Sequence, residues 1–174
     1  MTKRNIFLYG AISILFASIG VYLAANKQQA ESPKATAATR LFPLSLPDAN
    51  GKSHDFSQWK GKTLVVNFWA TWCAPCVQEM PELSALQTEA GLKNTQIIGI
   101  GIDSEANIAE FSSKYKISYP LYVSGAGGTE LSREFGNVSG GLPFTVLIGP
   151  DGQVKKTYLG RLKLEELRRD IASL

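Results

Sequence analysis

The sequence predicts an α/β fold in which a mixed central sheet is flanked by helices on both faces. Three near-continuous apolar runs support this prediction, at residues 64–69, 97–102 and 144–148. Runs without polar alternation are typical of strands that a helix-covered sheet buries on both faces. A helical pattern separates the first two runs and a turn signal follows the third, so the expected order is a βαβ unit followed by a ββα unit.

The first elements in this order are a small hairpin and a helix. Apolar residues between 44 and 56 lie on either side of Asn50-Gly51, a dipeptide that favours a tight turn. The helix follows Cys73, and its apolar stripe consists of Val77, Met80, Leu83 and Leu86. That spacing is typical of a helix that packs one face against a sheet.

The later elements are indicated by caps and turns. Asp103 or Ser104 can cap a second helix, whereas Gly125–Gly128, with three glycines, predicts a mobile turn. The turn signal Pro150–Gly152 leads into a strand at 154–159, which forms an antiparallel hairpin with the third apolar run. A closing amphipathic helix carries Leu162, Leu164, Leu167, Ile171 and Leu174.

Length and charge restrict the classes of function. The chain has 174 residues, which suits one domain with an appendage, and its 44% hydrophobic content argues against a disordered chain. Residues 1–26 carry Lys3, Arg4 and no acid, so the remainder holds 16 basic and 15 acidic side chains. Because this part of the chain lacks the excess of basic residues that nucleic-acid binding requires, we expect no nucleic-acid partner.

An uncharged apolar run at residues 6–25 predicts a transmembrane signal anchor. Lys3 and Arg4 precede it, so residues 1–5 are expected in the cytoplasm and the body outside it. A cleaved signal peptide ending near Leu23-Ala24-Ala25 is the alternative, but its apolar region would be shorter. A buried core helix is disfavoured because the run is apolar on every face.

The anchor leads into a polar tether and then into the body. Residues 26–40 are rich in Ala and Thr and lack periodicity, so they predict a flexible linker. Residues 41–174 form the predicted domain. The expected location is the bacterial cytoplasmic membrane, with a single span and the domain in the periplasm or outside the cell.

The chemistry is expected at Cys73 and Cys76, the only two cysteines of the chain. Cys73 follows a buried strand and begins a helix, whose unpaired N–H groups stabilise a thiolate. Cys76 lies one turn further, close enough to attack a mixed disulfide and release the product. The spacing and context therefore predict thiol–disulfide exchange.

Three other uses of the cysteines compete with this prediction. A zinc site needs four ligands, and His54 is the only histidine that could join the two thiols. A cysteine protease or acyltransferase needs a base that is paired with the cysteine, and a single histidine in the chain gives little support for such a pair. Two inert buried thiols fit poorly with a strand-to-helix turn.

Two segments resemble a known family. VVNFWATWCAPCVQEMPEL at residues 65–83 resembles the active-site stretch of the membrane-anchored TlpA/ResA-like thiol-disulfide oxidoreductases. GGLPFT at residues 140–145 resembles the cis-proline loop of that family. The resemblance covers residues 41–174 and implies a thioredoxin fold with an N-terminal hairpin and a central βα insertion.

The resemblance also implies roles for individual residues. Cys73 would be the attacking thiol and Cys76 the resolving one. Pro143 would be the cis residue packed against them, with the backbone of Leu142 free to pair with a substrate strand. Trp72 would cover the disulfide, although a plain core aromatic is the alternative.

Two positions depart from related patterns and concern proton transfer. Thioredoxins have a buried Asp where this chain has Asn67, which cannot titrate. Glu79 matches the acid of the CxxCxxExP pattern, and a carboxylate desolvated near the thiols would have a raised pKa suited to accepting a proton. The alternative is a solvated helix face. Ala74 occupies the place of the acid that ResA-like proteins carry between the cysteines.

The direction of electron flow is expected to be reductive. Ala74-Pro75 supplies no positive charge that would stabilise the reduced form of a strong oxidant. The resemblance then implies disulfide-containing proteins as substrates and a membrane electron donor of the DsbD/CcdA type.

The process that this reduction serves is either cytochrome c maturation or general reduction of periplasmic disulfides. Phe144 stands where the cytochrome-specific branch has an acid. We expect no metal, no cofactor and a monomer.

Two alternative functions share features with this interpretation. A peroxiredoxin-like peroxidase has the same topology, but its family favours a Thr-x-x-Cys nucleophile site. A copper chaperone would bind Cu(I) through both thiols and His54, because copper(I) prefers soft ligands. His54, however, precedes the cysteines and is expected on the surface of the hairpin.

Overall fold

The computed structural model describes residues 41–89, 92 and 94–174. Its main sheet has the order β5-β4-β3-β6-β7, with β3, β4 and β5 parallel and β6 and β7 antiparallel to their neighbours. These strands are β3 Thr63–Trp69, β4 Thr95–Gly101, β5 Leu121–Val123, β6 Phe144–Ile148 and β7 Val154–Leu159. All residues of β3 and β6 are buried, as their unbroken apolar runs predict.

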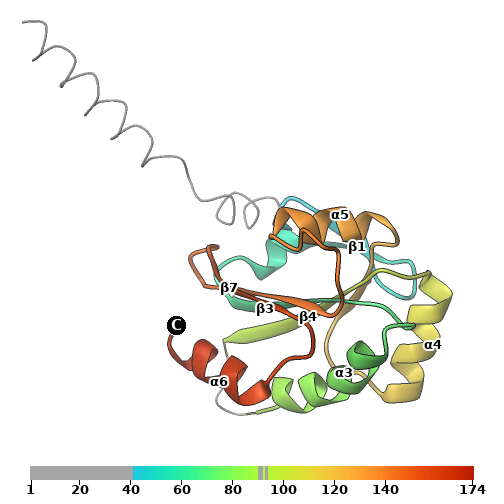
Figure 1. Ribbon diagram of the computed structural model, residues 1–174. Helices are drawn as coiled ribbons and strands as arrows, with labels where there is room; N and C mark the ends of the chain where they lie inside the picture. Colours follow the sequence, from blue (N-terminus) through green and yellow to red (C-terminus); the bar gives the residue numbers. More distant parts are fainter. Residues whose placement is uncertain (1–40, 90–91, 93) are drawn as a thin grey trace, which may run out of the picture. The chain divides into compact units, whose positions relative to one another are not determined.

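Helices cover both faces of this sheet (Figure 1). The helices α3, α4 and α6 lie on one face, and α5 lies on the other with the N-terminal hairpin. Their bounds are α3 Ala74–Gln87, α4 Glu105–Tyr115, α5 Gly127–Glu134 and α6 Leu164–Ala172. Of the two candidate caps for α4, Ser104 is the N-cap, and its side chain accepts a hydrogen bond from the Asn107 N–H.

The two faces of the sheet bury separate apolar clusters because successive strand residues point to opposite sides. Odd-numbered strand residues such as Val65, Trp69 and Ile97 pack with α3, α4 and α6. Even-numbered residues such as Val66 and Phe68 pack with the N-terminal hairpin region and the end of α5. The face with α3 also carries the cysteines, so this face positions the chemistry.

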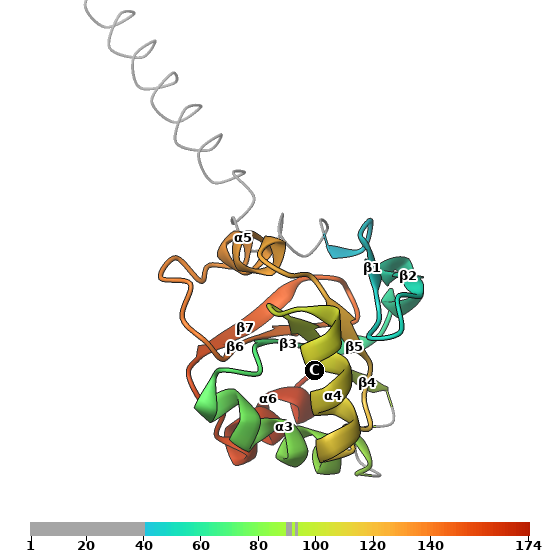
Figure 2. The ribbon, with the colours of Figure 1, turned by 90° about the vertical axis from the view of Figure 1, so that its right-hand side faces the viewer.

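The predicted N-terminal hairpin is present and attached to the sheet edge. Its strands, β1 Ser45–Pro47 and β2 Ser53–Asp55, are antiparallel, and a 3-10 turn, η1 Phe56–Trp59, follows them. Asp48 forms an isolated bridge with Tyr122 of β5, which places the hairpin beside that edge strand (Figure 2). The hairpin therefore covers the sheet edge that β5 would otherwise expose.

The turn predicted at Gly125–Gly128 is present only at Gly125 and Ala126, and the second half of the segment is helical. Gly127 and Gly128 form the first turn of α5, which with β5 is the expected central βα insertion. A Cβ on Gly128 would clash with the Ser124 side chain and lie 2.8 Å from Cγ1 of Ile102. The second glycine thus permits close packing of the helix on the sheet, a use that composition does not distinguish from flexibility.

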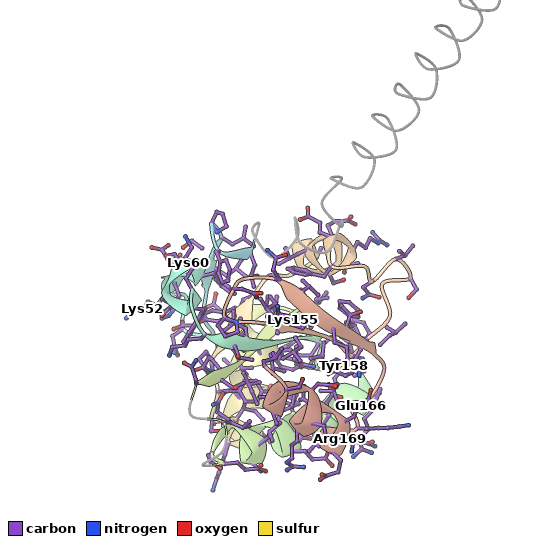
Figure 3. The ribbon with its side chains drawn as sticks, turned by 90° about the vertical axis from the view of Figure 1, so that its left-hand side faces the viewer. Lys52, Lys60, Lys155, Tyr158, Glu166 and Arg169 are labelled. Carbon is purple, nitrogen blue, oxygen red and sulfur yellow. A yellow bond between two sulfur atoms is a disulfide. The ribbon has the colours of Figure 1, made fainter. Side chains whose placement is uncertain are left out.

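The closing helix α6 is joined to β7 by polar contacts as well as by its apolar stripe. Lys156 Nζ lies 2.7 Å from Glu166 Oε1 and 2.8 Å from Asp170 Oδ2, and the Tyr158 hydroxyl donates to Asp170 Oδ2 at 2.6 Å. Figure 3 shows Tyr158 and Glu166 side by side where strand and helix meet. These contacts fix the segment Gly160–Lys163, which enters the site described below.

Several predictions concern residues outside the described ranges. The anchor at 6–25, the cytoplasmic residues 1–5 and the linker at 26–40 all lie there. Among the helices that the structure describes, none combines the length and apolar character needed to cross a membrane.

Candidate active site

The strand β3 ends in a short loop that delivers Cys73 to the start of α3. The Cys73 N–H donates to the Ala70 carbonyl at 3.2 Å, which closes this loop. The Asp103 carboxylate, just past β4, accepts hydrogen bonds from the backbone N–H of Thr71 at 3.2 Å and from its hydroxyl. Two adjacent parallel strands therefore fix the approach to the cysteine at their carboxyl ends.

Cys73 and Cys76 form a disulfide at the N-terminus of α3. Cys73 is the N-cap residue, and its Sγ accepts a hydrogen bond from the Cys76 backbone N–H at 3.3 Å. Cys73 is 6% exposed whereas Cys76 is fully buried. An incoming group thus meets Cys73 first, at the end of the helix whose N–H groups stabilise negative charge on sulfur.

Glu79 is fully buried one turn after Cys76, on the same face of α3. Its Oε1 accepts a hydrogen bond from Asn67 Nδ2 at 2.8 Å, and its Oε2 accepts one from the Leu162 N–H at 2.9 Å. The alternative of a solvated helix face is therefore wrong. The carboxyl group links α3 to the centre of β3 and to the segment before α6.

Burial raises the pKa of Glu79 from 4.5 to about 7. The hydrogen bonds from Leu162 and Asn67 and the charge of Arg161 oppose this effect, while the charge of Glu82 adds to it. Near neutral pH the carboxyl group is consequently divided between its two protonation states. A group in that condition can both take and release a proton.

Asn67 is held between Glu79 and β6. Its Nδ2 also donates to Thr145 Oγ1 at 3.0 Å, whereas its Oδ1 has no hydrogen-bond partner within the described residues. A half-turn of the amide would present Oδ1 to Glu79 instead. The site can therefore accommodate a protonated Glu79, whose hydroxyl needs an acceptor.

The proline loop lies directly before β6. The Leu142–Pro143 peptide bond is cis, as the resemblance implies, and the Pro143 carbonyl accepts from the Gly160 N–H at 2.8 Å. Pro143 is buried and Leu142 half-buried. Because β6 begins at Phe144, Leu142 lies beyond the end of the strand pairing.

Trp72 is 70% exposed on the loop immediately before Cys73. The alternative of a plain core aromatic is therefore wrong. An exposed aromatic ring next to a reactive sulfur is available to contact an incoming protein.

Two supporting residues were missed by sequence reasoning. Asn137 is 2% exposed, and its Nδ2 donates to the Gly141 carbonyl at 2.9 Å and to Ser132 Oγ at 3.1 Å, which secures the proline loop. Thr145, also buried, is the acceptor for Asn67 described above. A polar residue inside an otherwise apolar strand was the signal for Thr145, whereas nothing in the pattern marked Asn137.

His54 lies on β2 rather than in the arrangement around the cysteines. Its Nε2 is 2.8 Å from Asp48 Oδ2, and its ring packs edge-on against Tyr122. Within residues 41–89, 92 and 94–174, no three side chains of His, Cys, Asp or Glu form a group that could hold a metal ion.

Comparisons with known proteins agree with this geometry. The chain matches the Redoxin family over residues 25–171. A thiol-disulfide oxidoreductase ResA from Bacillus cereus is 31% identical over 167 residues, which cover 95% of this chain and 94% of that protein. ResA from Geobacillus thermodenitrificans is 26% identical over 162 residues, covering 92% and 90%.

Solved structures show the same fold. A thiol:disulfide interchange protein of the thioredoxin family from Chlorobium tepidum has a TM-score of 0.64 at 27% identity, and the match covers 75% of this chain and 91% of that one. The predicted thioredoxin-like arrangement of a mixed sheet and flanking helices is confirmed by this likeness.

Proposed function

Because the chain belongs to the Redoxin family, and is a thiol-disulfide oxidoreductase similar to ResA, we propose that it reduces disulfide bonds of proteins outside the cytoplasm. The observation that carries this proposal is the asymmetry of the pair, with Cys73 partly accessible at a helix N-terminus and Cys76 buried behind it. Attack and resolution are thereby assigned to different sulfurs.

In the proposed reaction the reduced protein begins with a Cys73 thiolate. This thiolate attacks one sulfur of the substrate disulfide, forms a mixed disulfide and expels the other substrate sulfur as a thiolate. Cys76 then gives its proton to Glu79 and attacks Cys73 Sγ. The second substrate sulfur leaves as a thiolate. The substrate is then reduced, and Cys73 and Cys76 are oxidised to a disulfide.

The proline loop and Trp72 would hold the substrate during this exchange. Leu142 lies outside the pairing of β6, so its backbone can pair with an extended substrate segment next to the disulfide. The cis Pro143 fixes the direction of that backbone, and the exposed Trp72 offers an apolar contact immediately before Cys73 in the sequence.

The reduction potential of the Cys73–Cys76 pair tests the reductive direction. The dipeptide between the cysteines is uncharged, so we expect a value well below the roughly −180 mV of protein disulfide isomerase. Equilibration of the full chain in detergent with dithiothreitol, followed by tryptophan fluorescence, measures it. A value near the roughly −120 mV of DsbA would contradict the proposal and indicate an oxidase or isomerase.

A reductase outside the cytoplasm needs a source of electrons. We propose that residues 6–25 anchor the chain in the cytoplasmic membrane and that a donor of the DsbD/CcdA type re-reduces the pair. Tethering through residues 26–40 would raise the effective concentration of the domain near such a donor. General reduction of extracytoplasmic disulfides and cytochrome c maturation are both compatible with this supply.

The anchor is tested by fractionation. The full chain is expected to remain in the membrane fraction after washing with alkaline carbonate, because an uncharged run of twenty residues is long enough to span the hydrocarbon core. A matched variant with arginines in place of Ile14 and Leu15 should appear in the soluble fraction or fail to be exported. Release of the unchanged chain by carbonate would contradict an uncleaved anchor.

A further inference from the structure

A cavity of about 280 Å³ lies beside the disulfide, between the start of α3 and the side of α4. Figure 2 shows these two helices next to each other on the same face of the sheet. Two of the lining residues flank the cysteines, since Thr71 precedes Cys73 by two residues and Val77 follows Cys76 directly. The Val77 N–H donates to the Cys73 carbonyl at 3.1 Å, so the cavity begins within one helical turn of Cys73.

The apolar lining of this cavity comes mainly from two aromatic rings of α4. Phe111 is 6% exposed and Tyr115 is 36% exposed, and their ring centroids are 4.4 Å apart. Phe111 also packs on the buried Trp69, with 4.8 Å between the ring centroids. Val77 is half-buried and adds an aliphatic surface to the rings. A lining of this kind favours an apolar occupant, because the occupant removes apolar surface from water.

The charged residues at the cavity have opposite signs. Glu110 and Lys114 of α4 are both exposed, so together they favour neither an acidic nor a basic side chain. Lys114 Nζ lies 5.4 Å from the centroid of the Tyr115 ring, which is a cation–π contact. A second aromatic ring beside Tyr115 would have the same ammonium group within reach, whereas an aliphatic side chain would not interact with it in this way.

Hydrogen bonds fix the polar wall of the cavity. The Thr71 N–H and hydroxyl donate to Asp103, and Asn107 Nδ2 donates to the same carboxylate group at 2.7 Å. The loop before the cysteines is thereby connected to the first turn of α4. A wall that is already ordered loses little conformational entropy when a ligand enters. The volume lies just below the roughly 300–1,000 Å³ of sites for drug-sized ligands, so the cavity suits a single side chain.

We propose that this cavity is a specificity site, which receives an aromatic side chain of the substrate protein next to the cysteine under attack. This inference rests on the proposed function, because it concerns the protein whose disulfide Cys73 reduces. Trp72 and Leu142 are the substrate contacts proposed above, and the cavity extends that surface on the side of Thr71. Disulfides flanked by aromatic residues are thus reduced faster than the same disulfides flanked by small residues.

The experiment compares short alanine-rich peptides, each closed into a ring by one disulfide. On both sides of each cysteine they carry phenylalanine, alanine, aspartate or lysine. The reduced full chain in detergent is mixed with each peptide, and chromatography after acid quenching gives the second-order rate constant of peptide reduction. The same reaction with dithiothreitol corrects for the intrinsic reactivity of each peptide. After this correction the phenylalanine peptide is expected to react about tenfold faster than the alanine peptide, which matches partial burial of one aromatic side chain.

Variants of Tyr115 test whether this preference comes from the cavity. Tyr115→Ala removes one of the two rings and should lower the phenylalanine-to-alanine ratio to about threefold or less, whereas Tyr115→Phe keeps the ring and should keep the ratio. Tyr115 is the last residue of α4 and is partly exposed, so both variants are expected to fold. The control Leu174→Ala removes an exposed apolar side chain beyond α6, outside the cavity, and should leave both rates unchanged.

The outcomes separate this inference from the proposed function. Equal corrected rates for the phenylalanine and alanine peptides, or a ratio that Tyr115→Ala does not change, would overturn the inference. Faster reaction of the aspartate or lysine peptide than of the phenylalanine peptide would also overturn it, because a charge at the cavity would then select the substrate. In each of these cases the peptides are still reduced and the proposed function stands. A reduced chain that reacts with none of the peptides would contradict the proposed function and the inference with it.

Discussion

Replacing Cys76 by serine is expected to arrest the reaction at the mixed disulfide. Cys73 keeps its place at the start of α3 and can still attack, but the sulfur that resolves the adduct is gone. Turnover with insulin as substrate should fall by about 10³-fold or more, while a covalent adduct accumulates that dithiothreitol releases. Non-reducing gel electrophoresis and mass spectrometry measure the adduct.

The matched control is Cys73→Ser, which leaves the fully buried Cys76 as the only thiol. We expect neither turnover nor an adduct from this variant, because an incoming disulfide does not reach the remaining sulfur. Accumulation of an adduct on Cys76 in place of Cys73 would contradict the assignment of roles.

Replacing Glu79 by glutamine is expected to remove most of the loss of stability that the protein undergoes between pH 4.5 and pH 8. The pKa of Glu79 is about 7 in the folded protein and 4.5 in the absence of the fold. The folded state therefore binds the proton more tightly than the unfolded state does. The stability that this proton gives to the fold is fully present below pH 4.5 and is lost as the pH rises through 7. The two values differ by an amount worth roughly 3 kcal/mol.

Urea unfolding of the oxidised protein from pH 4 to pH 8.5 measures this effect. Wild type should lose roughly 3 kcal/mol of unfolding free energy through this group, whereas Glu79→Gln should be nearly flat and more stable than wild type at pH 8. The glutamine can accept from Leu162 and donate to the turned Asn67 amide, whose Oδ1 is otherwise without a partner among the described residues. The control Glu110→Gln, at an exposed position of α4, should follow wild type within about 0.5 kcal/mol. A Glu79→Gln curve that still falls with pH would contradict the assignment.

The sequence predicts the main elements because their signals are local. The unbroken apolar runs define β3, β4 and β6, and the turn at Pro150–Gly152 defines the β6–β7 hairpin. The family resemblance implies a helix in the central insertion, but the residues of α5 do not indicate it themselves. Leu131 is the only large apolar residue among the eight, so there is no apolar stripe, and the two leading glycines are typical of a flexible turn. Its packing depends on Ser124 and Ile102, which only the folded chain brings together.

The candidate site was predictable to a similar degree. Cys73 and Cys76 follow from their spacing and from their place between a strand and a helix, whereas the proline loop and Glu79 were implied by the family resemblance. The partners of Glu79 were not predictable, since Asn67, Thr145 and the Leu162 N–H come from three separated segments. Periodicity indicates which face of a strand is buried, but it does not indicate which two buried polar groups meet.

The position of Glu79 places a limit on engineering this protein for heat resistance. Its carboxyl group accepts hydrogen bonds from the middle of β3 and from the chain before α6, so it is part of the scaffold as well as of the proposed chemistry. A selection for thermostability at neutral pH would favour a neutral side chain at this position and would discard the proposed proton acceptor with it. Variants that gain stability without losing turnover should therefore carry their substitutions elsewhere and retain Glu79.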